Sequence, residues 1–286
     1  MNEERPSITA EGAAVMRALH QSSEHEPRIL DDPISPRLVD MRSDFYKARI
    51  ELLQRLPPLT RSRFETTFVM RNRFAEDCLA AAADRGVRQY VVLGAGLDTF
   101  AYRQPPWARS LHIFEVDQFA TQQWKRRLLS EANISAPGNL SFVPVDFERT
   151  SLATALRQAR LDLNVATFFS LLGVTQYLTE EALDQTLQFI LSGCSGSEIV
   201  FSFVVSDELL PADNIGLVKA IAAQSAAAGE PWISRFHPDQ LVDRLRSMRF
   251  SGVFHLSPEE ANQRYFQNRR DGLTASILEQ MIRAIV

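Results

Sequence analysis

Short apolar runs alternate with helical hydrophobic patterns through the middle of the chain. The short runs predict buried strands at 89–93, 111–116, 140–145, 165–172 and 199–205. Apolar residues spaced three or four positions apart predict amphipathic helices at 64–86, 119–131, 152–159 and 180–191. This alternation indicates right-handed strand–helix–strand crossovers and a mainly parallel sheet, which is the organisation of an α/β protein.

The beginning of the chain is less regular than its middle. Residues 1–63 are polar and interrupted by prolines, and we expect helices there near 11–21 and 36–55. We expect this segment to form a helical extension that packs on a core domain spanning residues 64–286.

An insertion of residues 206–237 follows the fifth predicted strand, and its middle is expected to be helical. It is a candidate lid over a binding site. Pro238 then opens another helix, and residues 252–256 are expected to form a strand. A late strand pair at the sheet edge is expected to be antiparallel, as α/β sheets often have at an edge.

The composition is that of an ordinary globular protein, with 286 residues, 45% of them hydrophobic, and a net charge of −4. A nucleic-acid-binding surface needs a basic field, so no nucleic-acid partner is expected. The first residues lack an apolar signal core, and no run of about 18 apolar residues occurs, so we expect a cytoplasmic protein without a membrane partner. The two cysteines predict buried thiols, and the scattered histidines predict no metal site. Nothing in the sequence indicates an oligomeric state.

A glycine-rich turn, Gly94-Ala95-Gly96, follows the first predicted strand. Glycine lets the backbone turn sharply and lets a ligand approach closely, and ligands of open α/β sheets bind beyond the carboxyl ends of the strands. A dinucleotide fingerprint would need a third small residue where this chain has Thr99. The turn therefore favours a nucleoside cofactor without pyrophosphate over NAD, although a plain strand–helix turn could have the same residues.

Acidic residues follow the next two predicted strands. Glu115 and Asp117 end the second strand, where an acid that binds ribose hydroxyls is expected. Asp146 and Phe147 follow the third strand and would suit adenine, because a carboxylate accepts from the exocyclic amine and an aromatic ring covers the base. Each acid could instead cap a helix, but three such features in successive loops together indicate an adenosyl-binding site.

A family resemblance covers most of residues 10–205. The segments that carry it are 69–74, 86–99, 102–103, 114–118, Lys125, 143–147 and 177–179. They resemble the leucine carboxyl methyltransferase-like family of class I S-adenosylmethionine-dependent methyltransferases. The resemblance implies a Rossmann-like fold, with a mainly parallel seven-stranded sheet and helices on both faces, and it implies S-adenosylmethionine as the cofactor.

The resemblance also implies roles for individual residues. Arg71 would grip the methionine carboxylate with its guanidinium fork, and Asp117 would hold the ribose. Together with the residues considered above, the cofactor-binding candidates are Arg71, Gly94, Ala95, Gly96, Glu115, Asp117, Asp146, Phe147 and Leu171. The chain departs from the family pattern at Leu172, where many members have a glutamate that contacts the cofactor's amino group.

The expected activity is an S-adenosylmethionine-dependent O-methyl transfer to a small-molecule carboxylate or hydroxyl of secondary metabolism. Tyr177 and His237 are the candidate catalytic residues, the first orienting the acceptor and the second acting as a base. The candidate substrate contacts are Tyr177, Trp232, Arg235 and Phe236. Two alternatives stay open, namely a carboxyl methyltransferase of a peptide or protein C-terminus and a non-catalytic cofactor-binding protein.

Overall fold

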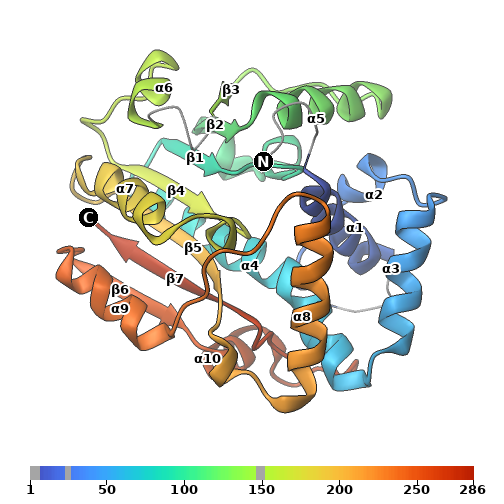
Figure 1. Ribbon diagram of the computed structural model, residues 1–286. Helices are drawn as coiled ribbons and strands as arrows, with labels where there is room; N and C mark the ends of the chain where they lie inside the picture. Colours follow the sequence, from blue (N-terminus) through green and yellow to red (C-terminus); the bar gives the residue numbers. More distant parts are fainter. Residues whose placement is uncertain (1–6, 23–26, 146–151) are drawn as a thin grey trace.

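A seven-stranded sheet forms the centre of the molecule in the computed structural model, which describes residues 7–22, 27–145 and 152–286 (Figure 1). The strand order is β3-β2-β1-β4-β5-β7-β6. The strands are β1 Gln89–Leu93, β2 His112–Asp117, β3 Leu140–Pro144, β4 Thr167–Leu171, β5 Glu198–Val204, β6 Gly252–Leu256 and β7 Glu279–Ile285. Strands β1 to β5 pair in parallel, whereas β7 is antiparallel to both β5 and β6. The expected mainly parallel sheet with an antiparallel strand pair at its edge is confirmed.

Helices cover both faces of this sheet. They are α1 Ile8–Ser22, α2 Ser35–Leu38, α3 Asp44–Arg55, α4 Pro58–Asp84, α5 Phe119–Glu131, α6 Leu152–Gln158, α7 Glu180–Leu191, α8 Ala212–Ala227, α9 Pro238–Ser247 and α10 Pro258–Ala261. Helix α4 packs on one face, and α6, α7 and α9 pack on the other.

The central strand β1 shows why its sequence reads as continuously apolar. Val91 and Leu93 belong to the core shared with α6, α7 and α9, while Tyr90 and Val92 belong to the core shared with α4. Because successive side chains of a strand point to opposite faces, a strand covered on both faces needs apolar residues at nearly every position.

The N-terminal segment differs from the expectation in one respect. The single helix expected over 36–55 is two helices, α2 and α3, separated by a turn. Ser43 makes this break, because its amide donates to the Asp40 carbonyl at 3.0 Å and its side chain caps α3 by accepting from the Tyr46 amide at 3.1 Å. Helix α4 also starts before residue 64, at Pro58, a residue whose fixed φ suits the first turn of a helix.

Helices α1, α3 and α8 lie together beside the carboxyl ends of the parallel strands (Figure 1). Residues from all three line one cavity with the strand tips. Segments far apart in the sequence therefore meet where ligands bind in this class of sheet.

Candidate functional site

A cavity of about 560 Å³ opens at the carboxyl ends of β1 and β4. Its lining includes the glycine-rich turn after β1, the tip of β2, the segment that follows β4, and the first residue of β7. Helices α1, α3, α4, α7 and α8 contribute further lining residues.

The turn after β1 is a backbone cradle. Gly94 has φ +69° and Gly96 has φ +44°, both in the left-handed region that favours glycine. A Cβ at Gly94 would overlap the Val174 side chain. The amides of Gly94 and Ala95 both donate to the Val116 carbonyl, at 2.8 and 3.0 Å, so the turn is fastened to the end of β2.

Asp117 lies at the tip of β2 and lines the cavity. Its Oδ2 accepts from the Gly96 amide at 2.5 Å, and its Oδ1 accepts from the Gln118 amide at 2.7 Å. Burial raises the pKa of this carboxyl, while the two backbone hydrogen bonds lower it. Each carboxylate oxygen can accept more than one hydrogen bond, so Asp117 can also receive ligand hydroxyls.

Glu115, the other acid of the same strand, does not line the cavity. Its Oε2 accepts from Lys125 Nζ at 2.7 Å, and both side chains are only 1% exposed. Burial raises the pKa of Glu115 to about 7, although the Lys125 ammonium lowers it. The structure therefore does not bring Glu115 to the cavity, because α5 covers that part of β2 with Lys125.

Arg71 reaches the cavity from α4 and meets a residue that the sequence did not indicate. Its Nη1 donates to both carboxylate oxygens of Glu279, at 3.1 and 3.2 Å, and the two side chains are 10% and 8% exposed. The Arg71 guanidinium lies 5.3 Å from the Phe68 ring centroid, and its Nε is buried without a protein partner. Gly173 makes room for it, since a Cβ there would overlap the guanidinium.

At the end of β4 the structure brings Leu172, and not Leu171, to the cavity. Leu171, a candidate cofactor contact, is fully buried in the sheet core and does not line the cavity. Leu172 does line it. Leu171 is the last residue of β4 in register with β1, so its side chain points into one core and its successor lies at the strand tip. The expected contacts Asp146 and Phe147 lie outside the described residues.

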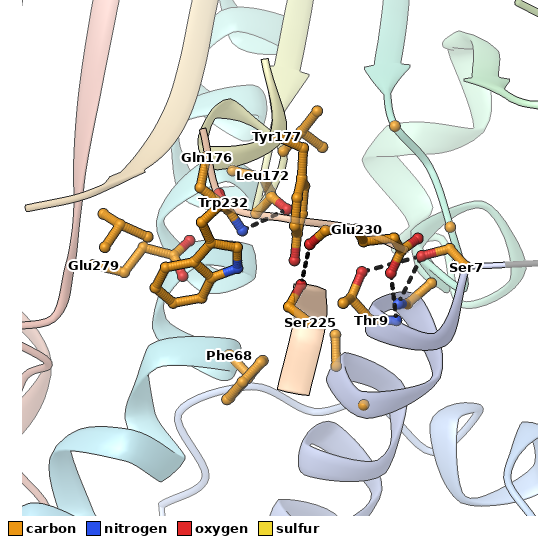
Figure 2. Close-up of a pocket in the computed structure, with 18 of the residues that line it drawn as sticks. Ser7, Thr9, Phe68, Leu172, Gln176, Tyr177, Ser225, Glu230, Trp232 and Glu279 are labelled. Atoms are coloured by element: carbon orange, nitrogen blue, oxygen red, sulfur yellow. Dashed lines mark hydrogen bonds between the residues drawn. The ribbon is translucent and has the colours of Figure 1, made fainter. Parts of the chain in front are cut away.

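Aromatic and amide side chains build another part of the cavity lining (Figure 2). Tyr177 and Trp232, both expected, line it together with Phe68 and Gln176, which were not. The Trp232 indole Nε1 and the Gln176 Oε1 are buried without a protein partner. An unused donor and an unused acceptor in the lining are the groups that orient a ligand in an otherwise apolar pocket.

Three expected contacts, Arg235, Phe236 and His237, do not line the cavity. Phe236 pairs with Val205 in an isolated parallel bridge, so it is buried against the sheet and its amide donates to the Val204 carbonyl at 3.0 Å. Arg235 forms an ion pair with Asp207. His237 precedes the first turn of α9 as its N-cap residue. Trp232 and Ile233 line the cavity, but the bridge between Phe236 and Val205 holds the following residues against the sheet instead.

Contacts between the beginning and the later part of the chain close the cavity. Glu230, which follows α8, accepts from the Thr9 amide of α1 at 3.1 Å. The Glu230 carbonyl accepts from Ser225 Oγ of α8. Ala10 of α1 packs on the glycine turn so closely that a Cβ at Gly96 would lie 3.0 Å from the Ala10 Cβ. Figure 2 shows the Glu230–Thr9 contact on the right and the Ser225–Glu230 hydrogen bond near the centre.

In the described ranges, no group of three or more histidine, cysteine, aspartate or glutamate side chains is arranged to hold a metal ion. Over the same ranges, no helix combines the length and the apolar character that a membrane crossing requires.

Comparison with known proteins identifies relatives along nearly the whole chain. The family model for leucine carboxyl methyltransferase matches residues 10–191. YktD of Bacillus subtilis (strain 168), named as a candidate S-adenosyl-L-methionine-dependent methyltransferase, is 35% identical, and the match covers 96% of this chain and 96% of YktD. A candidate S-adenosyl-L-methionine-dependent methyltransferase of Mycolicibacterium gilvum (strain PYR-GCK) is 30% identical over 73% of this chain and 71% of the relative.

Solved structures share the fold. A candidate methyltransferase from Thermobifida fusca YX superposes with a TM-score of 0.61 at 16% identity, covering 99% of this chain and 95% of the other. A DUF574 family protein from Streptomyces avermitilis MA-4680 gives a TM-score of 0.58 at 16% identity, with 96% of each chain covered. At such identities the likeness concerns the fold alone, and it confirms the Rossmann-like class I architecture.

Proposed function

The chain belongs to the leucine carboxyl methyltransferase family and is an S-adenosylmethionine-dependent methyltransferase, and from this premise we propose that it methylates an oxygen atom of a small-molecule acceptor, a carboxylate or a hydroxyl. The observation that carries the proposal is one continuous cavity, which joins the glycine turn and Asp117 to a chamber lined by Tyr177 and Trp232. Cofactor and acceptor can therefore meet inside a single enclosed space.

The residues at the strand tips fit S-adenosylmethionine. The positive φ values of Gly94 and Gly96 leave a cradle free of Cβ atoms, over which the methionine part can pass. We assign the ribose hydroxyls to Asp117, which replaces Glu115 as the sole ribose acid of β2. We assign the methionine carboxylate to Arg71, whose buried Nε has no protein partner.

Glu279 limits how Arg71 can act. In the structure Arg71 Nη1 is engaged by both Glu279 oxygens. The Nε donor, and the Nη2 donor that forms no hydrogen bond to Glu279, stay available for a second carboxylate. The Arg71 guanidinium has five N–H donors in a planar fork. It can therefore bind Glu279 and the carboxylate of the cofactor at the same time.

The enclosure favours a small acceptor over a protein C-terminus. Helix α1 and the segment after α8 meet across the cavity through the Glu230–Thr9 contact. We propose that the N-terminal extension, residues 1–63, and the insertion of the 64–286 domain, residues 206–237, act together as a cover over the cavity. A folded protein partner would need this cover displaced, whereas a small molecule fits beneath it.

The chemistry that the protein itself must supply is alignment. When bound, S-adenosylmethionine supplies a methyl group on a positively charged sulfur. Tyr177, Trp232 and Gln176 then hold the acceptor oxygen in line, and the cover excludes water. A carboxylate acceptor is already ionised at neutral pH and needs no base. His237 is not retained as a base, because it does not reach the cavity.

Two measurements test this function. Methyl transfer from radiolabelled S-adenosylmethionine to a panel of aromatic and aliphatic acids and phenols should yield O-methyl products, identified by mass spectrometry. Binding of S-adenosylhomocysteine without turnover of any member would favour the non-catalytic alternative instead. Turnover of a peptide C-terminus but of no small molecule would favour a carboxyl methyltransferase of a peptide or protein C-terminus.

A further inference from the structure

Arg49 of α3 lines the cavity and differs from the other cavity arginines in having no counterion. Arg17 pairs with Asp32 at 3.1 Å, and Arg71 pairs with Glu279 at 3.1 Å. The Arg49 guanidinium lies over the Phe45 ring, 5.6 Å from its centroid, and neither an ion pair nor a hydrogen bond joins it to any residue of the described ranges.

Burial makes the lack of a counterion at Arg49 energetically unfavourable. It lowers the pKa of Arg49, and no charged group among the described residues acts in the opposite direction. A partly desolvated cation without a partner destabilises the ligand-free fold, so its presence in a cavity points to a ligand that supplies the missing charge.

The helix that faces Arg49 makes room for it. Gly12 is buried within α1, and a Cβ at that position would lie 3.3 Å from Arg49 Nη2. Glycine is less favourable than alanine inside a helix. The space left by the missing side chain at Gly12 therefore lies directly beside the unpaired guanidinium of Arg49, in the wall of the cavity.

We propose that Arg49 binds a carboxylate of the methyl acceptor, and that the acceptor is an acid with an apolar body. This inference rests on the proposed function. The lining that surrounds the cavity supplies apolar contacts for such a body, from Phe45, Phe64, Phe68, Val218 and Ile221. The two buried acids of the chamber already have partners, because Glu279 binds Arg71 and Glu230 binds the Thr9 amide. A planar guanidinium fork matches the two oxygens of a carboxylate.

Arg71 and Arg49 would bind anions at two separate positions in the cavity. The methionine carboxylate of the cofactor belongs with Arg71, which Gly173 admits next to the end of β4. Arg49 comes from a different helix, α3, and reaches the cavity beside Gly12 of α1. Loss of Arg49 should therefore affect the acceptor and leave the cofactor in place.

The test is calorimetry on the full chain saturated with S-adenosylhomocysteine. The probes are benzoate, phenylacetate, cinnamate and octanoate, each compared with its primary amide. Wild-type protein should bind at least one acid about tenfold more tightly than its amide, the size expected for a charge-assisted hydrogen-bonded pair. Arg49→Gln should bring that acid to within about twofold of the amide, and Arg49→Lys should be intermediate.

Controls keep the outcomes distinct. Arg55→Gln changes an exposed arginine of the same helix, whose side chain is 79% exposed, and should leave the acid preference intact. Thermal denaturation of ligand-free Arg49→Gln should show a midpoint at or above that of wild type, because an uncompensated charge is removed.

Three results would overturn the inference: no acid binds, acids and amides bind alike to wild type, or Arg49→Gln keeps the preference. A tenfold loss of S-adenosylhomocysteine affinity in Arg49→Gln would also overturn it, since Arg49 would then serve the cofactor. Failure of wild-type protein to bind S-adenosylhomocysteine is a different result, because it removes the proposed function itself.

Discussion

Asp117 at the tip of β2 accepts a hydrogen bond from the Gly96 amide at 2.5 Å, so one carboxylate fixes the turn that follows the neighbouring strand β1. The same carboxylate faces the cavity. Asp117 therefore fixes the shape of the glycine turn and can also accept hydrogen bonds from a ligand bound there.

Replacement of Asp117 by alanine should weaken S-adenosylhomocysteine binding by about tenfold or more, because it removes the ribose acceptor and loosens the Gly96 turn. Isothermal titration calorimetry measures the change, and circular dichroism verifies folding. 5′-Methylthioadenosine, which keeps the ribose, should lose a similar factor. Unchanged affinity in a folded variant would remove the ribose assignment.

Replacement of Arg71 by lysine should discriminate between ligands with and without the amino-acid part. It keeps the positive charge beside Glu279 but loses the planar fork, so S-adenosylhomocysteine should bind about tenfold more weakly. 5′-Methylthioadenosine, which lacks the carboxylate, should bind within about twofold of its wild-type affinity. Arg73→Lys, on a more exposed arginine of the same helix, is the matched control. Equal losses for both ligands would contradict the assignment.

The buried Glu115 predicts a pH dependence of stability. Its pKa rises from 4.5 to about 7 in the folded protein. Below pH 4.5 the group is protonated in both states, and as the pH rises to 7 only the unfolded chain gives up its proton. The free energy of unfolding should therefore fall by about 3 kcal/mol over this window through Glu115 alone.

Urea denaturation of wild type and Glu115→Gln between pH 4.5 and 7.5 measures this contribution. The glutamine variant cannot ionise, so its stability should decline less over the window than that of wild type. Two parallel curves would mean that Glu115 stays ionised in the folded protein throughout, held so by Lys125.

The Glu230–Thr9 contact should slow the release of the cofactor product. Glu230→Ala removes the acceptor for the Thr9 amide, so the dissociation rate of S-adenosylhomocysteine should rise about tenfold, with a smaller change in the association rate. Stopped-flow fluorescence measures both rates. Glu208→Ala alters an exposed acid of the same insertion and should change neither. An unaltered dissociation rate would show that the contact does not hold the cover closed.

Each feature that the sequence could predict lies close in sequence to the end of a single strand. The glycine turn and Asp117 lie within a few residues of strands whose apolar runs are plain, and parallel pairing necessarily brings such tips together. Glu115 and Leu171 do not line the cavity, although Leu171 is the last residue of β4 and Glu115 lies two residues before the end of β2. Within a strand that is covered on both faces, such a residue points into a core instead of a cavity.

The features that the sequence could not predict depend on contacts between distant segments. Glu279 meets Arg71 across 208 positions, and Glu230 meets Thr9 across 221. No local pattern reports such a pairing. Arg49 resembles any solvated helix arginine in sequence, and only the structure places it in the cavity beside Gly12.

A crystal structure of the protein with S-adenosylhomocysteine tests the central claim most directly. The predicted result has the ribose hydroxyls on Asp117, the carboxylate on Arg71, and the sulfur directed into the chamber of Tyr177 and Trp232. A ligand that left Asp117 and Arg71 without contacts, or whose sulfur faced away from that chamber, would contradict it.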